Sequence, residues 1–134
     1  MTAQAMSPKE RQPQDVERET AFWLASLMRR EFGLTPSATS ATLAGEMLRV
    51  RLEGALSPMA RLIAESPDGP QILRRVHTLF FDANRLRMHA LIGRIVGRPI
   101  RRSALAVDLP GGDVLVWFEL GPRPGETAST RPLA

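Results

Sequence analysis

Two histidines, His77 and His89, are the residues best suited by type to acid–base or metal chemistry. They are twelve residues apart in one predicted helix, which separates them by more than ~100° around its axis and places them too far apart to share a metal ion. Asp82 precedes Arg85 by three residues, a spacing typical of an ion pair on a helix surface. These spacings favour surface or boundary roles and predict no metal site.

Hydroxyl and phosphate chemistry is also poorly supported. Ser57 has no histidine nearby in sequence and stands where a helix needs an N-terminal cap. Gly111 and Gly112 lie between two predicted strands, whereas phosphate-binding loops open a helix. The chain contains no cysteine, which excludes disulfides, thiol nucleophiles and cysteine-based metal sites. We therefore expect no catalytic residues, no cofactor and a protein that is not an enzyme.

Arginine supplies almost all of the positive charge, because Lys9 is the only lysine in a chain of net charge +4. The densest cluster is Arg94, Arg98, Arg101 and Arg102, at a predicted helix end, and it is our candidate site for an anionic partner. The alternative is that these cations only complement the negative end of the helix dipole. No aromatic residues are interleaved with them, although single-stranded nucleic acid would need aromatic rings for stacking.

The stretch Leu48–Pro58 is the most informative about architecture. Its leucines and valine alternate with arginines, which predicts a strand with one apolar face. Gly54 then ends the strand in a conformation poor for other residues, Ser57 caps the next helix, and Pro58 occupies its first turn, where a missing N–H costs nothing. Gly97, followed by Pro99, ends a later helix in the same manner as Gly33 ends the first.

The remaining elements follow from apolar periodicity. Helices are predicted over 15–31, 58–65 and 71–96, and hairpins over 37–52 and 100–120. The order α-β-β-α-α-β-β predicts an α+β fold in which a four-stranded antiparallel sheet has its helices packed on one face. We expect one domain over 14–120, with flexible tails at 1–13 and 121–134 that are rich in Pro, Gly, Ser, Thr and charge.

The long predicted helix carries two apolar stripes. The first is expected to face the core and contains Ile72, Val76, Leu79, Phe80, Ala83, Leu86 and Ala90. The second contains Met88, Leu91, Ile92 and Ile95, roughly 110° away around the helix. We interpret the second stripe as a partner surface, with a homodimer as the simplest partner. The alternative is a helix that bends around its own sheet.

No window approaches the ~20 apolar residues needed to span a bilayer, and the first residues lack a secretory signal, so we expect a cytoplasmic protein that does not cross a membrane.

A family resemblance adds a functional context. The run Val50–Pro58, the break Glu65–Gly69, the long helix and the segment Leu91–Arg98 together resemble the MpsC-like family, over about 22–120. That family is named as a component of a sodium-translocating, membrane-potential-generating system and was long catalogued as a domain of unknown function. The resemblance implies a small cytosolic accessory protein linked to membrane ion or bicarbonate systems, and it carries no catalytic residues to this chain.

The sequence and the family resemblance therefore indicate two candidate functions. The first is a non-enzymatic accessory module that works by protein contact, with a second copy and a membrane transport component as its partners. The alternative is a nucleic-acid-binding or regulatory module that uses the arginines of the long helix and the third strand, and nucleic acid is ranked below the protein partners.

Overall fold

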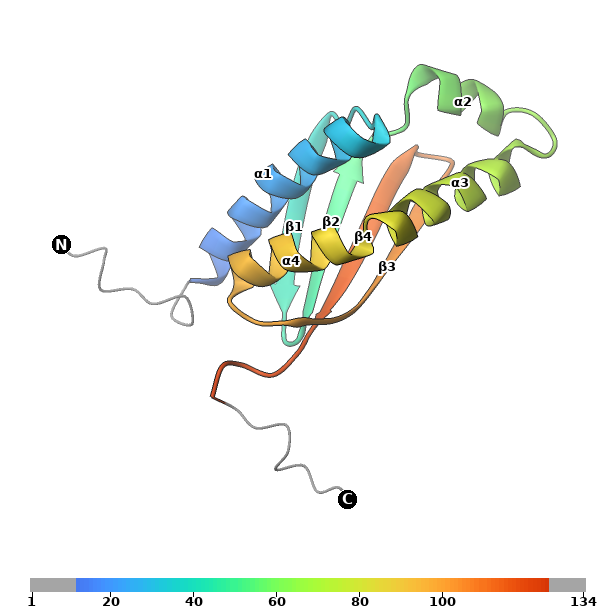
Figure 1. Cartoon of the computed structure of the whole chain (residues 1–134). Coiled ribbons are helices and arrows are strands. Elements are labelled where there is room, and N and C mark those ends of the chain that lie inside the picture. Colours follow the sequence, from blue (N-terminus) through green and yellow to red (C-terminus); the bar gives the residue numbers. More distant parts are fainter. Residues whose placement is uncertain (1–11, 126–134) are drawn as a thin grey trace.

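The computed structural model of the chain describes residues 12–125, and it confirms the predicted order of helices and strands and the α+β class (Figure 1). The elements are α1 (Pro13–Phe32), β1 (Ala38–Ala44), β2 (Met47–Glu53), α2 (Pro58–Ala64), α3 (Gly69–Ala83), α4 (Arg85–Val96), β3 (Ile100–Asp108) and β4 (Asp113–Leu120). The tails predicted at 1–13 and 121–134 lie mostly outside the described residues. Within the described part, Pro13 is the first residue of α1 and Gly121 is buried.

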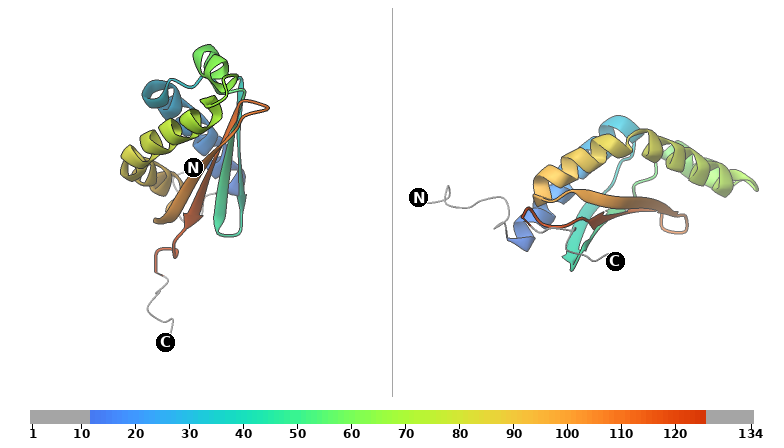
Figure 2. Two further views of the ribbon diagram at one scale, coloured as in Figure 1. Left: turned by 90° about the vertical axis from the view of Figure 1, so that its right-hand side faces the viewer. Right: turned by 60° about the horizontal axis from the view of Figure 1, so that its bottom comes forward.

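The four strands form one antiparallel sheet in the order β1-β2-β4-β3. Side chains alternate between the two faces of a strand, so Leu48, Val50 and Leu52 of β2 are buried while Met47, Arg49 and Arg51 are exposed. β4 repeats this pattern with Val114, Val116, Phe118 and Leu120 on the buried face. The helices cover that face, and the other face of the sheet is open (Figure 2).

α1 packs along the edge strand β1. Its stripe of Val16, Thr20, Leu24, Leu27 and Met28 is buried. The carboxylate of Glu17 accepts a hydrogen bond from the backbone N–H of Leu43 at 2.8 Å, which satisfies a donor on the edge strand. Trp23 is 49% exposed, because it lies at the margin of this stripe and borders a shallow hollow between α1 and α4.

The connection from β2 to α2 is as predicted. Gly54 has a φ of 55°, in the left-handed region that other residues rarely adopt. The Oγ atom of Ser57 accepts a hydrogen bond from the backbone N–H of Ala60 at 3.2 Å, and Pro58 is the first residue of α2. Ser57 is therefore a helix cap.

The predicted long helix is two helices, which meet at Asn84 with φ −105° and ψ 7°. The backbone N–H and the side-chain amide of Asn84 both donate to the carbonyl of Phe80, at 3.1 Å and 3.0 Å, so the side chain adds a second hydrogen bond to the last turn of α3. Of the two interpretations of the second apolar stripe, a partner surface or a bent helix, the structure shows the helix that bends over its own sheet.

This bend corrects the assignment of both stripes. Met88 and Ile92 are fully buried and Ile95 nearly so, which contradicts their interpretation as a partner surface; only Leu91 of that group is partly exposed. Conversely, the stripe expected in the core is exposed, with Leu79 at 56% and Leu86 at 83%. The reason is that α3 buries a neighbouring set of residues instead: Leu73, His77 and Phe81.

Candidate interaction surfaces

The first surface is an apolar stripe on the solvent side of α3 and the start of α4. We define this outer stripe as Ile72, Val76, Leu79, Phe80 and Leu86, all of them exposed large hydrophobic residues. At about 100° per residue, Leu79 points roughly opposite to the buried residues Leu73, His77 and Phe81. Leu79 therefore faces away from the sheet, whereas Phe80, at the inner margin of the stripe, contacts the ring of Phe32 of α1 at a centroid separation of 6.1 Å.

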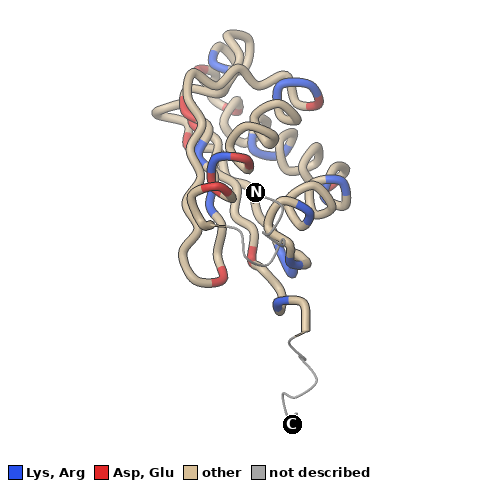
Figure 3. Tube along the Cα trace, turned by 90° about the vertical axis from the view of Figure 1, so that its left-hand side faces the viewer, with Lys and Arg blue, Asp and Glu red and all other residues tan. Residues whose placement is uncertain are grey.

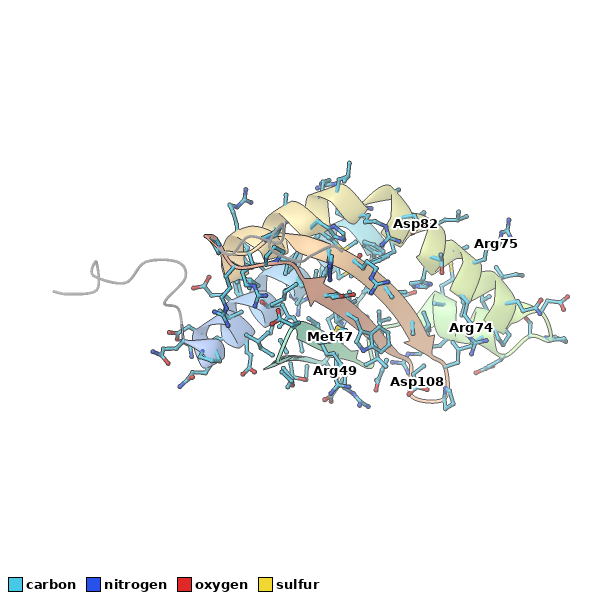
Figure 4. The ribbon with its side chains drawn as sticks, turned by 90° about the horizontal axis from the view of Figure 1, so that it is seen from below. Met47, Arg49, Arg74, Arg75, Asp82 and Asp108 are labelled. Carbon is cyan, nitrogen blue, oxygen red and sulfur yellow. The ribbon has the colours of Figure 1, made fainter. Side chains whose placement is uncertain are left out.

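Charged residues flank the outer stripe. Arg75 and Asp82 are seven residues apart and so lie on the same side of α3. A carboxylate oxygen of Asp82 is 2.5 Å from a guanidinium nitrogen of Arg85. Neither Arg74 nor Arg75 forms an ion pair within residues 12–125, and the two point in different directions from α3 (Figure 4). This helix thus combines an apolar solvent face with two arginines that have no acidic partner in the described part of the chain.

The predicted arginine cluster is not a free cationic patch. The side chain of Arg98 is only 9% exposed, donates to the carbonyl of Gly121 at 2.9 Å and pairs with Glu46. Arg101 and Arg102 share the carboxylate of Glu119, at 3.4 Å and 2.7 Å.

The pairing of β3 with β4 explains why Arg101 and Arg102 are neutralised, because it places Glu119 directly opposite Arg102. Arg94 lies apart from the other three, beside the hollow between α1 and α4. Acidic and basic positions are intermingled along the sheet rather than segregated (Figure 3).

A polar cluster joins α4 to β3. His89 Nε2 lies 2.7 Å from Ser103 Oγ, and Arg85 donates to the same oxygen at 2.8 Å and to the Ser103 carbonyl at 3.0 Å. Burial, and secondly the positive charge of Arg85, lower the pKa of His89.

Serine and histidine can together form a nucleophile and its general base. Here Arg85 already donates to the serine oxygen, so these contacts hold α4 against β3. No pattern along the chain indicates this cluster, because Ser103 and His89 belong to different elements.

His77 is buried, and its Nδ1 lies 2.7 Å from the carbonyl of Leu73 one turn earlier, so Nδ1–H donates within the helix. Within residues 12–125, no group of His, Asp and Glu side chains is placed to hold a metal ion.

The second surface is a hollow of about 330 Å³ on the open face of the sheet. Strand register builds it, because Arg49 is the direct partner of Thr42 on one side and Trp117 on the other, and Arg51 is the partner of Ser40 and Leu115. Arg49 and Met47 point away from the helices (Figure 4). Sequence reasoning missed this site, because the alternation in β2 shows only that its arginines share one face and cannot place Trp117 beside them.

Asp113 fixes one end of this hollow. Its Oδ1 atom accepts the backbone N–H of Gly54 at 2.8 Å, and its Oδ2 atom accepts from Arg51 at 2.6 Å. The Gly54 N–H, together with Arg51, holds the pKa of Asp113 below its ordinary value, although burial acts in the opposite direction. Arg51 is therefore held in place, whereas Arg49 forms no ion pair with the residues that the structure describes.

Comparison with known proteins supplies one match. A family model described as Na+-translocating membrane potential-generating system (MpsC) matches residues 12–120. No curated protein and no solved structure matches the chain. Across residues 12–125, no helix combines the length and the apolar character that crossing a membrane requires.

Proposed function

Because the chain belongs to the MpsC family, described as a Na+-translocating membrane potential-generating system, we propose that it is a non-enzymatic accessory protein that acts by protein contact and forms a homodimer. The observation that carries the proposal is the outer stripe of α3. By its family, the protein partner beyond the second copy is a component of a membrane transport system. We also propose a cytoplasmic location, where an accessory protein could reach the cytoplasmic side of a membrane transport system.

The size of the outer stripe supports an interface. Its five side chains expose ~450 Å² of apolar surface, if a large side chain offers ~170 Å² when fully exposed. An apolar patch of a few hundred Å² often marks a contact site, and a standard interface uses about 800 Å² from each partner. The stripe would form the apolar centre of such an interface, and the flanking charged residues its polar rim.

The spacing of the outer stripe favours a second copy as the occupant. Within α3, Ile72, Val76, Leu79 and Ala83 follow one another at steps of four, three and four residues, which is the spacing of a coiled-coil seam. The seam ends at Ala83, because α3 meets α4 at Asn84 and Leu86 lies beyond this bend. Two copies packed antiparallel about a twofold axis at Leu79 would therefore place each Val76 against the Ala83 of the other copy.

Charge is also complementary in this arrangement. Arg75 lies four residues before Leu79 and Asp82 three residues after it, on the same flank of the helix. A twofold axis perpendicular to the two antiparallel helices keeps each flank on its own side, so Arg75 of each copy would meet Asp82 of the other. The interface would contain two symmetric ion pairs.

Sedimentation of purified variants tests the dimer. Leu79→Glu places a charge at the centre of the interface and should give a folded monomer, because Leu79 is already 56% exposed. The matched control is Leu62→Glu on α2, where a similarly exposed leucine lies outside the outer stripe and the dimer should persist. A wild-type protein that sediments as a monomer at high concentration would end the proposal.

Charge exchange tests the register. Arg75→Glu alone should weaken the dimer by opposing Asp82 of the second copy, and adding Asp82→Arg should restore it. Restoration by the double variant would be unexplained if α3 packed in any other register.

The alternative of a nucleic-acid site on the long helix and third strand has less support, because Arg98, Arg101 and Arg102 are each paired with a carboxylate.

A further inference from the structure

We propose that the hollow on the open face of the sheet binds a nucleotide, meaning a flat aromatic ring that carries a phosphate group, either free or as one unit of a single strand. The site lies on the face of the sheet opposite the helices, whereas the outer stripe lies on the helical layer. The proposal is therefore independent of the dimer, and either can fail without the other.

The floor of the hollow suits an aromatic ring. Trp117 of β4 has Arg49 as its neighbour on β2 and Ala104 as its neighbour on β3. Ala106 in turn stands beside Leu115. Because these alanines are short, they leave room beside the indole, on which a planar ring could stack.

The walls of the hollow suit an anion. Arg49 is exposed and has no acidic partner within residues 12–125, although most arginines of the third strand and its approach are paired. Arg51 stands one row further along the same face and is held by Asp113. A phosphate entering here would meet the unpaired guanidinium of Arg49 and the guanidinium held by Asp113, and guanidinium groups bind phosphate oxygens through paired N–H donors.

The hydroxyl groups that line the hollow and its volume also fit a nucleotide. Ser40 and Thr42 line the β1 side of the hollow, where they can donate to a sugar or a phosphate. The volume of about 330 Å³ is at the small end of ligand sites, which begin near ~300 Å³. One nucleotide fits that volume, and a longer strand would have to continue across the open sheet.

Calorimetric titration of the full chain tests whether the hollow recognises both the ring and the phosphate group. The probes are adenosine monophosphate, adenosine and inorganic phosphate. The monophosphate should bind, and adenosine and phosphate should each bind about tenfold more weakly, because each lacks one of the two recognised groups. Trp117→Ala and Arg49→Gln should each weaken binding of the monophosphate roughly tenfold.

The matched control variants replace an arginine and a tryptophan that lie outside the hollow. Arg74→Gln removes a similarly exposed, unpaired arginine from α3, and Trp23→Phe removes the other tryptophan; both should leave the affinity unchanged. Trp23→Phe also makes Trp117 the only tryptophan, so that quenching of its fluorescence reports occupancy directly. If Trp117→Ala fails to fold, Arg49→Gln and the fluorescence signal still test the site.

A fluorescein-labelled uridine octamer distinguishes the two sources of the nucleotide. Octamer binding that is much tighter than monophosphate binding and weakens steeply with salt would identify a single strand. Equal or weaker octamer binding would identify a free nucleotide. The proposal is wrong if neither probe binds at millimolar concentration, or if binding is unchanged in both Trp117→Ala and Arg49→Gln.

Discussion

Asp113 holds the start of β4 to the end of β2, and replacing it should destabilise the fold measurably. In Asp113→Ala the buried carboxylate no longer accepts the Gly54 N–H, a charge-assisted hydrogen bond worth about 1.5–3 kcal/mol. The ion pair with Arg51 adds less than about 1 kcal/mol, because the Arg51 side chain is 54% exposed and screened by solvent. The free energy of unfolding should fall by about 2–3 kcal/mol, or roughly 8–12 °C in Tm.

The assay is unfolding in guanidinium chloride followed by circular dichroism. Asp113→Asn should cost less, about 1 kcal/mol, because its amide oxygen can still accept from Gly54 while the charge is lost. Asp108→Ala is the control: Asp108 is exposed, is the register partner of Asp113, and should change stability by under ~0.5 kcal/mol.

The effect should also depend on pH. The folded pKa of Asp113 lies below its ordinary value of 3.8, so the unfolded chain binds the proton first as the pH falls. The stabilisation is complete above pH 3.8 and is lost as the pH falls through the folded pKa, and the difference between wild type and Asp113→Asn should shrink there. An Asp113→Ala variant as stable as Asp108→Ala would refute this reasoning.

Three further predictions concern the helices. Ser57→Ala should cost ~1 kcal/mol in denaturant unfolding, because the first turn of α2 loses its cap, and an unchanged midpoint would contradict the cap. Since the pKa of His89 is lowered from 6.5, the wild type should lose stability as the pH falls from above 6.5 through the folded pKa, whereas His89→Gln should not show that loss; parallel pH profiles of the two proteins would refute this. Leu91→Glu combined with Ile92→Glu should unfold the protein, because Ile92 is fully buried, and a cooperative thermal transition in the double variant would contradict that burial.

Features set by neighbouring residues could be predicted from the sequence. The strand end at Gly54 and the cap at Ser57 depend on interactions within a few residues, and the alternation in β2 reports which face is buried. For the same reason the element order and the sheet were predictable, since each hairpin pairs strands that are adjacent in the chain.

Features set by distant pairing could not be predicted. α3 is apolar on two adjacent sides, and only its contact with the rest of the fold decides that Leu73 and Phe81 are buried and Leu79 is not. The break at Asn84 lacks the glycine or proline that usually marks one. The pairing of β2 with β4 brings Trp117 beside Arg49, and that of β3 with β4 brings Glu119 beside Arg102; neither proximity is visible along the chain.

The most direct test of the proposed dimer is disulfide cross-linking, because the chain has no cysteine of its own to compete with an introduced one. A twofold axis at Leu79 brings the two Leu79 side chains together, so Leu79→Cys should form an interchain disulfide under mild oxidation and run as a covalent dimer. Leu62→Cys, at a position of α2 that is even more exposed, should remain monomeric under the same conditions. Equal cross-linking of the two variants, or none at Leu79→Cys, would contradict a dimer formed through the outer stripe.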